Sequence, residues 1–162
     1  DVLQSRGLGD VYKRQIEIAR HSPNFGGDRV VKAHGKHVYI DYTGYQYDEL
    51  NNGEKILEIM IQSTRVANIR PVFSHVEEFD GQSSPPGFAA VVPLDESHIT
   101  AHCYYEKGWL AIDAFTCGDG DPDLIAEYIT RNLEIRMPGL QQMRRELVDR
   151  FLYNNVEEAV ID

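Results

Sequence analysis

The hydrophobic positions of this 162-residue chain follow two spacings, one of two residues and one of three to four. Runs rich in β-branched and aromatic residues predict strands, whereas apolar residues three and four apart predict amphipathic helices. The expected strands cover residues 29–42, 69–79, 88–96, 98–105 and 109–117, and the expected helices cover 53–68, 122–133 and 139–153. The apolar face of the last predicted helix consists of Leu140, Met143, Leu147 and Phe151.

Short connections join the predicted strands. Residues 80–87 are expected to form a loop, because Pro85 and Pro86 bar regular backbone hydrogen bonding. Residues 106–108 are few enough for a hairpin, and Pro122 is well placed to open a helix. Hairpin-linked strands mixed with helices predict an α+β fold, namely a two-layer sandwich in which helices pack on one face of an antiparallel sheet.

The chain has the length of one domain with a single core. Residues 1–15 follow neither spacing, so we set them aside as a non-native or disordered leader. Residues 16–155 are expected to form the domain, and residues 156–162 a frayed tail.

Composition and charge narrow the function. The net charge is −10 and no basic stripe is present, which disfavours nucleic acid and anionic lipid and favours a positively charged small molecule. We expect no membrane span, since no apolar run approaches the roughly 20 residues required. The two cysteines are too few for a disulfide framework. Reduced thiols and a cytoplasmic location are therefore expected.

Serine, histidine and cysteine side chains gather on the last predicted strands. A metal site is disfavoured, because strand alternation would place His98 and His102 on one face and Cys103 on the other. We therefore expect no metal. A hydrolase using Ser97 or Cys117 with a histidine base has weak support, since no nucleophile-elbow glycines flank the serine. The third interpretation is that these side chains simply pack in the fold.

Two motifs in this region resemble one family. The run L-D-E-S-H-I-T-A-H at 94–102, followed by A-I-D-A-F-T-C-G at 111–118, is similar to the short bacterial and archaeal S-adenosylmethionine decarboxylases. The similarity includes the spacing, with a histidine five residues and a cysteine twenty residues after Ser97. It is strongest over 87–122 and extends more weakly over most of the chain outside its two ends.

The resemblance implies a proenzyme that cuts itself between Glu96 and Ser97. In the family, the serine hydroxyl attacks the preceding carbonyl to give an ester, and elimination leaves a dehydroalanine that hydrolyses to a pyruvoyl group. Here the β chain would end at Glu96, and the α chain would cover 97–162 with a pyruvoyl cofactor derived from Ser97 itself. Such a keto group forms a Schiff base with a substrate amine and accepts the electrons left when CO2 departs.

The resemblance also assigns roles to single residues. His102 matches the processing histidine that takes the α-proton during elimination. Cys117 matches the thiol that reprotonates the substrate carbon, with an inert buried cysteine as the alternative. Glu106 matches a glutamate that accepts hydrogen bonds from the ribose hydroxyls, with a solvated hairpin charge as the alternative. His98 and Cys103 match no role and are expected to pack or to lie on a strand face.

Two positions depart from the family pattern. Relatives carry a serine that assists processing where this chain has Ala89, so self-cleavage is expected to be slow or to use Ser83, Ser84 or a water molecule instead. Relatives stack an aromatic residue on the adenine ring where this chain has Ser83. We expect Phe79 or Phe88 to provide that surface here.

The expected function is decarboxylation of S-adenosylmethionine to the aminopropyl donor for spermidine synthesis. The alternatives are the same pyruvoyl chemistry on arginine or ornithine, and an uncleaved, non-catalytic homologue. The resemblance also implies a homodimer of cleaved protomers whose active sites contain residues of both copies.

Overall fold

The computed structural model describes residues 31–49 and 51–154, which form a six-stranded sheet and two α-helices. Neighbouring strands all run antiparallel, in the order β2-β3-β4-β5-β1-β6. Along the chain, the elements are β1 (Val31–Thr43), α2 (Gly53–Val66), β2 (His75–Phe79), β3 (Gly87–Pro93), β4 (His98–Tyr104), the 3-10 turn η1 (Tyr105–Lys107), β5 (Trp109–Cys117), α3 (Pro122–Arg136) and β6 (Gln141–Asn154).

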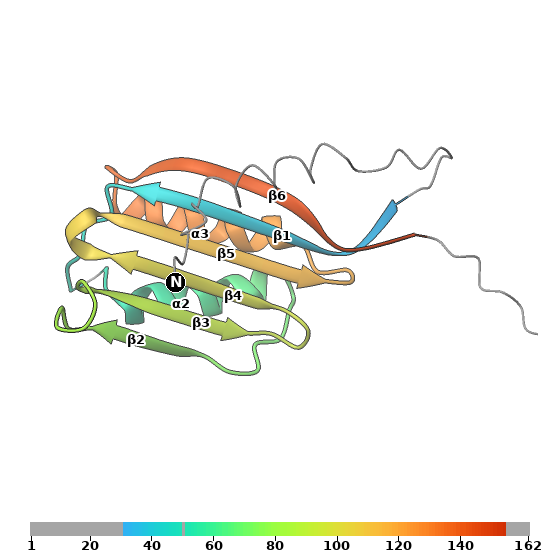
Figure 1. The fold of residues 1–162 in the computed structure, drawn as a ribbon, viewed down its shortest axis with the longest axis horizontal. Coiled ribbons are helices and arrows are strands. Elements are labelled where there is room, and N and C mark those ends of the chain that lie inside the picture. Colours follow the sequence, from blue (N-terminus) through green and yellow to red (C-terminus); the bar gives the residue numbers. More distant parts are fainter. Residues whose placement is uncertain (1–30, 50, 155–162) are drawn as a thin grey trace, which may run out of the picture. The chain divides into compact units, whose positions relative to one another are not determined.

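Both helices pack on the same face of the sheet, behind the strands in the view of Figure 1. The core lies between these two layers and contains fully buried side chains from each, such as Ile40 in β1, Met60 in α2, Ile112 in β5 and Ile129 in α3. Removing this apolar surface from water is the main force that holds the layers together. The predicted two-layer α+β sandwich is confirmed.

Local signals in the sequence set the start of each helix. Asn52 Oδ1 accepts the Lys55 N–H at 3.0 Å and caps α2. Asp121 Oδ1 accepts the Asp123 N–H at 2.9 Å, and Pro122 occupies the first turn of α3 as predicted. Neither helix is long and apolar enough to cross a membrane.

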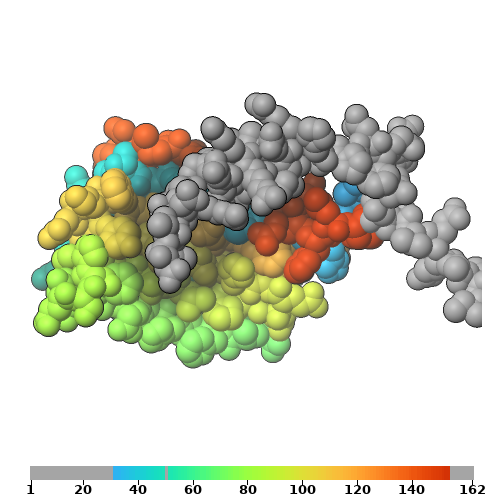
Figure 2. Space-filling view, viewed as in Figure 1, coloured from blue at the N-terminus to red at the C-terminus, as the bar shows by residue number. Residues whose placement is uncertain are grey.

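The other face of the sheet carries no helix from the described residues, and Figure 2 views the molecule from this side. In β4, Ile99, Ala101 and Cys103 are buried toward the helices, while His98 and His102 point away from them, as strand alternation predicts. We call the surface formed by His98, His102 and their cross-strand neighbours the open face. The candidate chemistry lies on this face and at its ends.

The predicted helix over 139–153 is wrong, because this segment is the edge strand β6. It pairs with β1 along nearly the whole length of that strand. The side chains that suggested an apolar helical face are largely exposed, with Met143 at 65%, Leu147 at 49% and Phe151 at 62%. Their three-and-four spacing is coincidental, since pairing with a strand about a hundred residues earlier supplies the backbone hydrogen bonds.

Two predicted strands are shorter than expected. The strand expected over 69–79 begins only at His75, because Pro71 has no N–H to donate and makes a single bridge to Leu94. The strand expected over 88–96 ends at Pro93, where the chain turns back toward β4. The Glu96–Ser97 peptide bond therefore lies in a turn and not in a strand.

Candidate active site at the turn between β3 and β4

The Glu96–Ser97 bond lies in a tight turn closed by backbone contacts. Pro93 pairs with His98 at the last rung of the β3–β4 ladder, and the Leu94 N–H donates to the Ser97 carbonyl at 2.9 Å. The turn is thus anchored at its base, while the Glu96–Ser97 peptide lies near its tip. Turns of this kind leave a peptide bond accessible to a neighbouring side chain.

A second segment fastens the turn from outside. Arg70, in the connection between α2 and β2, donates two hydrogen bonds to the Asp95 carboxylate, one of them from Nε to Oδ2 at 3.2 Å. The Val72 N–H donates to the Pro93 carbonyl at 3.0 Å. The guanidinium holds the pKa of Asp95 below its usual range, so this carboxylate is charged at neutral pH.

Cys117, the last residue of β5, contacts both sides of the bond. Its backbone N–H donates to Ser97 Oγ at 3.0 Å, and its thiol donates to the Glu96 carbonyl oxygen at 3.3 Å. The hydroxyl that would attack and the carbonyl that would be attacked are thus both hydrogen-bonded to Cys117. A cavity of about 380 Å³ opens beside this group.

The chain can place Cys117 there because it turns sharply after β5. Gly118 has φ +58°, a left-handed conformation that glycine adopts without strain, and its N–H donates to the His34 carbonyl at 2.9 Å. The Thr116 hydroxyl donates to the Gly120 carbonyl at 2.8 Å and closes the same turn from the other side. The F-T-C-G motif therefore has a local structural reason as well as a chemical one.

The structure does not bring His102 to Ser97 within one copy of the chain. The two residues are five positions apart along an extended segment, which corresponds to about 16 Å. His102 lines a separate cavity of about 460 Å³ at the other end of the open face. Glu106 is exposed in η1, beyond that same end of β4. The residues singled out by the motifs therefore form two groups at opposite ends of the sheet.

The two candidate aromatic residues differ in accessibility. Phe79 is half-buried at the end of β2, where it pairs with Gly87. Phe88 is fully buried on the helix side, with its ring centroid 6.2 Å from Tyr45 and 6.0 Å from Tyr105. In this structure Phe88 has no ring surface free for a ligand, so its position is that of a core residue.

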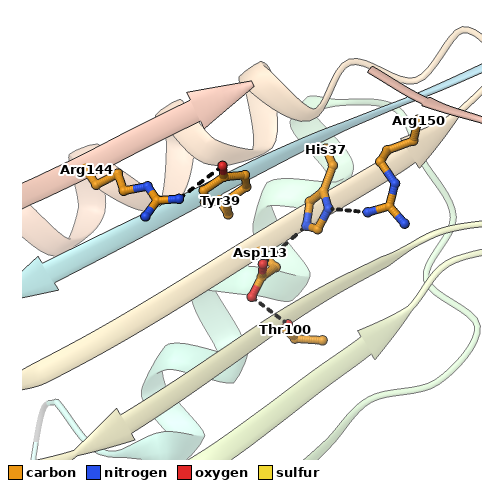
Figure 3. A network of polar contacts seen from close by, with 6 residues as sticks. All are labelled: His37, Tyr39, Thr100, Asp113, Arg144 and Arg150. Carbon is orange, nitrogen blue, oxygen red and sulfur yellow. Dashed lines mark hydrogen bonds and ion pairs between the residues drawn. The ribbon is translucent and has the colours of Figure 1, made fainter. Parts of the chain in front are cut away.

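A polar network in the middle of the open face escaped the sequence analysis (Figure 3). Arg150 donates to His37 Nδ1 at 3.1 Å, so the ring proton of a neutral His37 is on Nε2, which lies 3.2 Å from Asp113 Oδ1. The Thr100 hydroxyl donates to Asp113 Oδ2 at 3.3 Å. Arg150 comes from β6, the segment predicted as a helix, and no sequence signal placed it opposite β1.

Burial changes the acid–base properties of two side chains of β4, one on each face of the sheet. The His98 ring contacts the rings of His37 and Phe115, and its pKa is lowered, first by burial and then by the adjacent His37. Burial raises the pKa of the Cys103 thiol to about 12. In residues 31–49 and 51–154, no three His, Cys, Asp or Glu side chains are arranged to hold a metal ion.

Helices back one face of the antiparallel sheet, and a serine and a cysteine meet at a hairpin turn at one end of it. The protein is therefore of the α+β class, with a candidate active site at that end of the sheet. The sequence profile of the family described as S-adenosylmethionine decarboxylase matches residues 36–146. The chain belongs to this family.

Individual relatives agree with this assignment. The S-adenosylmethionine decarboxylase proenzyme of Caldicellulosiruptor saccharolyticus is 35% identical to this chain over 118 residues, which cover 71% of this chain and 90% of the relative. The Thermodesulfovibrio yellowstonii proenzyme is 31% identical over 115 residues, covering 70% and 82%. The crystal structure of the adenosylmethionine decarboxylase from Aquifex aeolicus superposes with a TM-score of 0.59 at 28% identity, covering 74% of this chain and 92% of that one.

Proposed function

We propose that this chain is a self-cleaving proenzyme that decarboxylates S-adenosylmethionine with a pyruvoyl group made from Ser97, and so supplies the aminopropyl donor for spermidine synthesis. The observation that carries the proposal is the pair of contacts from Cys117, one to Ser97 Oγ and one to the Glu96 carbonyl. They orient a hydroxyl and polarise the carbonyl beside it, which are the requirements for attack on that peptide bond.

Self-cleavage has a balanced course at this turn. Ser97 Oγ bonds to the Glu96 carbonyl carbon, the C–N bond breaks, and the nitrogen receives the hydroxyl proton, which leaves an ester. Loss of the Ser97 α-proton to a base then expels the Glu96 carboxylate and leaves a dehydroalanine. Water converts this residue to a pyruvoyl group and releases ammonia. The keto group supplies the electron sink that decarboxylation of an amino acid requires.

Cys117 has two successive tasks in this proposal. In the precursor, its thiol donates a hydrogen bond to the Glu96 carbonyl oxygen, where negative charge develops during attack. Departure of the Glu96 carboxylate then leaves the thiol facing the cavity beside the turn. From there it can return a proton to the substrate carbon after CO2 has left.

A second copy of the chain supplies the remaining groups. His102 and Glu106 lie at the far end of the open face from Ser97, so one copy alone does not assemble the proposed site. Two open faces packed about a two-fold axis, with their strands running in opposite senses, would place the His102 end of one copy over the Ser97 end of its partner. The homodimer would contain two such composite sites. Its free thiols Cys103 and Cys117 suit the cytoplasm.

Intact mass under denaturing conditions tests the proposal. The expected result is two fragments that divide between Glu96 and Ser97, the second of which gains mass with borohydride. The Ser97→Ala variant is the matched control and should stay one chain. The purified protein should release CO2 from S-adenosylmethionine. A wild-type chain that remains unbroken and has no reducible carbonyl would refute the proposal.

A second candidate is favoured by the two positions that differ from the family pattern. Ala89 is the cross-strand neighbour of His102 and offers no hydroxyl, and Ser83 is exposed in the loop before β3. An uncleaved, non-catalytic homologue would account for the first, and decarboxylation of arginine or ornithine for the second. The Ala89→Ser variant tests the first explanation, because it should speed cleavage if only the hydroxyl is lacking. CO2 release from each amino acid then identifies the substrate.

A further inference from the structure

A cluster of exposed apolar side chains surrounds His102 on the open face. Trp109 is 54% exposed, Tyr104 41% and Met143 65%. They come from β5, β4 and β6 and line the same cavity of about 460 Å³. Large apolar side chains gathered on one exposed surface indicate a binding site, and this volume is in the range of small-molecule pockets.

The register of the strands explains the shape of this cavity. Ala111 is the cross-strand neighbour of both His102 and Asp41, so a small side chain forms the floor between an imidazole and a carboxylate. Trp109 and Tyr104 are paired across β4 and β5 at the next open-face position. The cavity therefore has an aromatic wall, a low floor and two polar groups at its sides.

We propose that Trp109 provides the surface on which the purine ring of the substrate stacks. A purine has flat apolar faces and a polar edge, and this cavity offers the indole to the face and the Asp41 carboxylate to an exocyclic amine. A guanidinium would also contact an indole and a carboxylate, but its plane is smaller than that of a purine and covers less of this largely carbon wall.

Position in the sheet favours Trp109 over Phe79 for this role. Trp109 shares the cavity with His102, whereas Phe79 lies three strands away from Trp109, at about 14 Å. Trp109 would thus replace the aromatic residue that relatives carry at the position of Ser83. The inference rests on the proposed function, since the purine belongs to the substrate named there.

The chain contains a single tryptophan, so its fluorescence reports on this cavity alone. Titration of the full-length protein with 5′-methylthioadenosine, which has the purine but no amino acid, should quench the tryptophan emission in a saturable way. Arginine and ornithine should not. In calorimetry, Trp109→Ala should weaken binding of this probe at least about tenfold, and Trp109→Phe, which keeps a flat ring, should weaken it less than about threefold. Ile135→Ala, on the exposed side of α3, is the control.

Kinetics give a second readout. With S-adenosylmethionine, Trp109→Ala should raise KM by a similar factor and change kcat less than about threefold. Quenching by arginine instead of the purine would overturn the inference, as would an unchanged KM and probe affinity in Trp109→Ala. If the purine quenches but no decarboxylation occurs, the stacking site stands and the proposed function falls.

Discussion

The two cysteines differ in what surrounds their thiols, although they are only fourteen positions apart in the sequence. Cys103 is 1% exposed beneath the helices, and its pKa is about 12. Cys117 is half-buried beside the cavity at the β3–β4 turn. Since only the thiolate attacks an alkylating reagent, accessibility and pKa together should decide which residue reacts.

We therefore expect iodoacetamide at about pH 8 to modify Cys117 in the folded protein and to leave Cys103 untouched. Denaturation in urea should expose Cys103 and give a second adduct. Peptide mass spectrometry identifies the modified residue in each case. Labelling of Cys103 before Cys117 would contradict the burial described for β4.

His98 should make stability depend on pH. Its pKa in the folded protein is lower than the value of 6.5 for an unperturbed histidine, because burial and His37 disfavour the charged ring, while Asp113 partly opposes them and Arg150 adds to them. In the interval between the two values the unfolded chain binds more protons, so stability rises with pH there. The contribution is complete above 6.5 and is lost as pH falls toward the folded pKa.

The measurement is the free energy of unfolding in urea, at pH values on either side of 6.5. The wild-type protein should lose more stability on acidification than His98→Asn, whose side chain does not titrate. The difference between their slopes reports the titration of His98 together with its coupling to the adjacent His37. Equal slopes would show that the ring is solvated in the folded state.

Ser97 and Cys117 could be singled out from the sequence because each lies in a local motif, and the structure shows that they are in contact. His37, Asp113 and Arg150 were not predictable as a group, since their contact depends on the order β5-β1-β6. The distance between His102 and Ser97 could have been predicted from the sequence. Five residues of extended chain already place the two far apart.

At the scale of elements, the connection between α2 and β2 is bonded to the turn between β3 and β4. The Arg70–Asp95 ion pair is exposed, and solvent screening leaves pairs of this kind with little effect on stability. Its effect should instead be on the order of the turn, because it joins the residue two positions before Ser97 to a distant segment.

Arg70→Ala should therefore slow self-cleavage about two- to tenfold, by loosening the alignment of hydroxyl and carbonyl, and barely change Tm. The decay of the precursor band on a denaturing gel gives the rate. Lys55→Ala removes another exposed ion pair, on α2, and serves as the matched control. Equal cleavage rates in both variants would mean that the turn is ordered without Arg70.

The sequence analysis located most elements because their signals are local. Strand β5 has the predicted bounds 109–117, and Pro122 begins α3 as expected. The prediction for β6 was wrong for a physical reason. Met143, Leu147 and Phe151 are exposed, so this edge strand lacks the one-sided apolar alternation of a half-buried strand. Its conformation is set by β1, far away in the chain.

At the scale of the whole molecule, complementation between two variants can test why the motif residues are divided between the two ends of the sheet. If each site takes Ser97 and Cys117 from one copy and His102 and Glu106 from the other, two defective chains can complement each other. Cys117→Ala and Glu106→Ala should each have little activity alone. In a mixed dimer, one site would carry both defects and the other none.

Co-expression of the two variants in equal amounts should restore about a quarter of wild-type activity, since half of randomly paired dimers are mixed and each has one intact site. Decarboxylation assays on the co-purified protein measure this fraction. No recovery in dimers shown to be mixed would place all four residues in a single copy.

The location of the Glu96–Ser97 bond, where cleavage is proposed, also has a consequence for how the molecule is made. The break would fall beyond the last rung of the β3–β4 ladder, so seven residue pairs still bind the fragments to each other after cleavage. What is lost is the covalent link that lets those strands find one another as parts of one polymer. Renaturation of the mature enzyme would become a bimolecular encounter, slow at high dilution. The architecture would thus be assembled once, by the precursor, and afterwards only preserved.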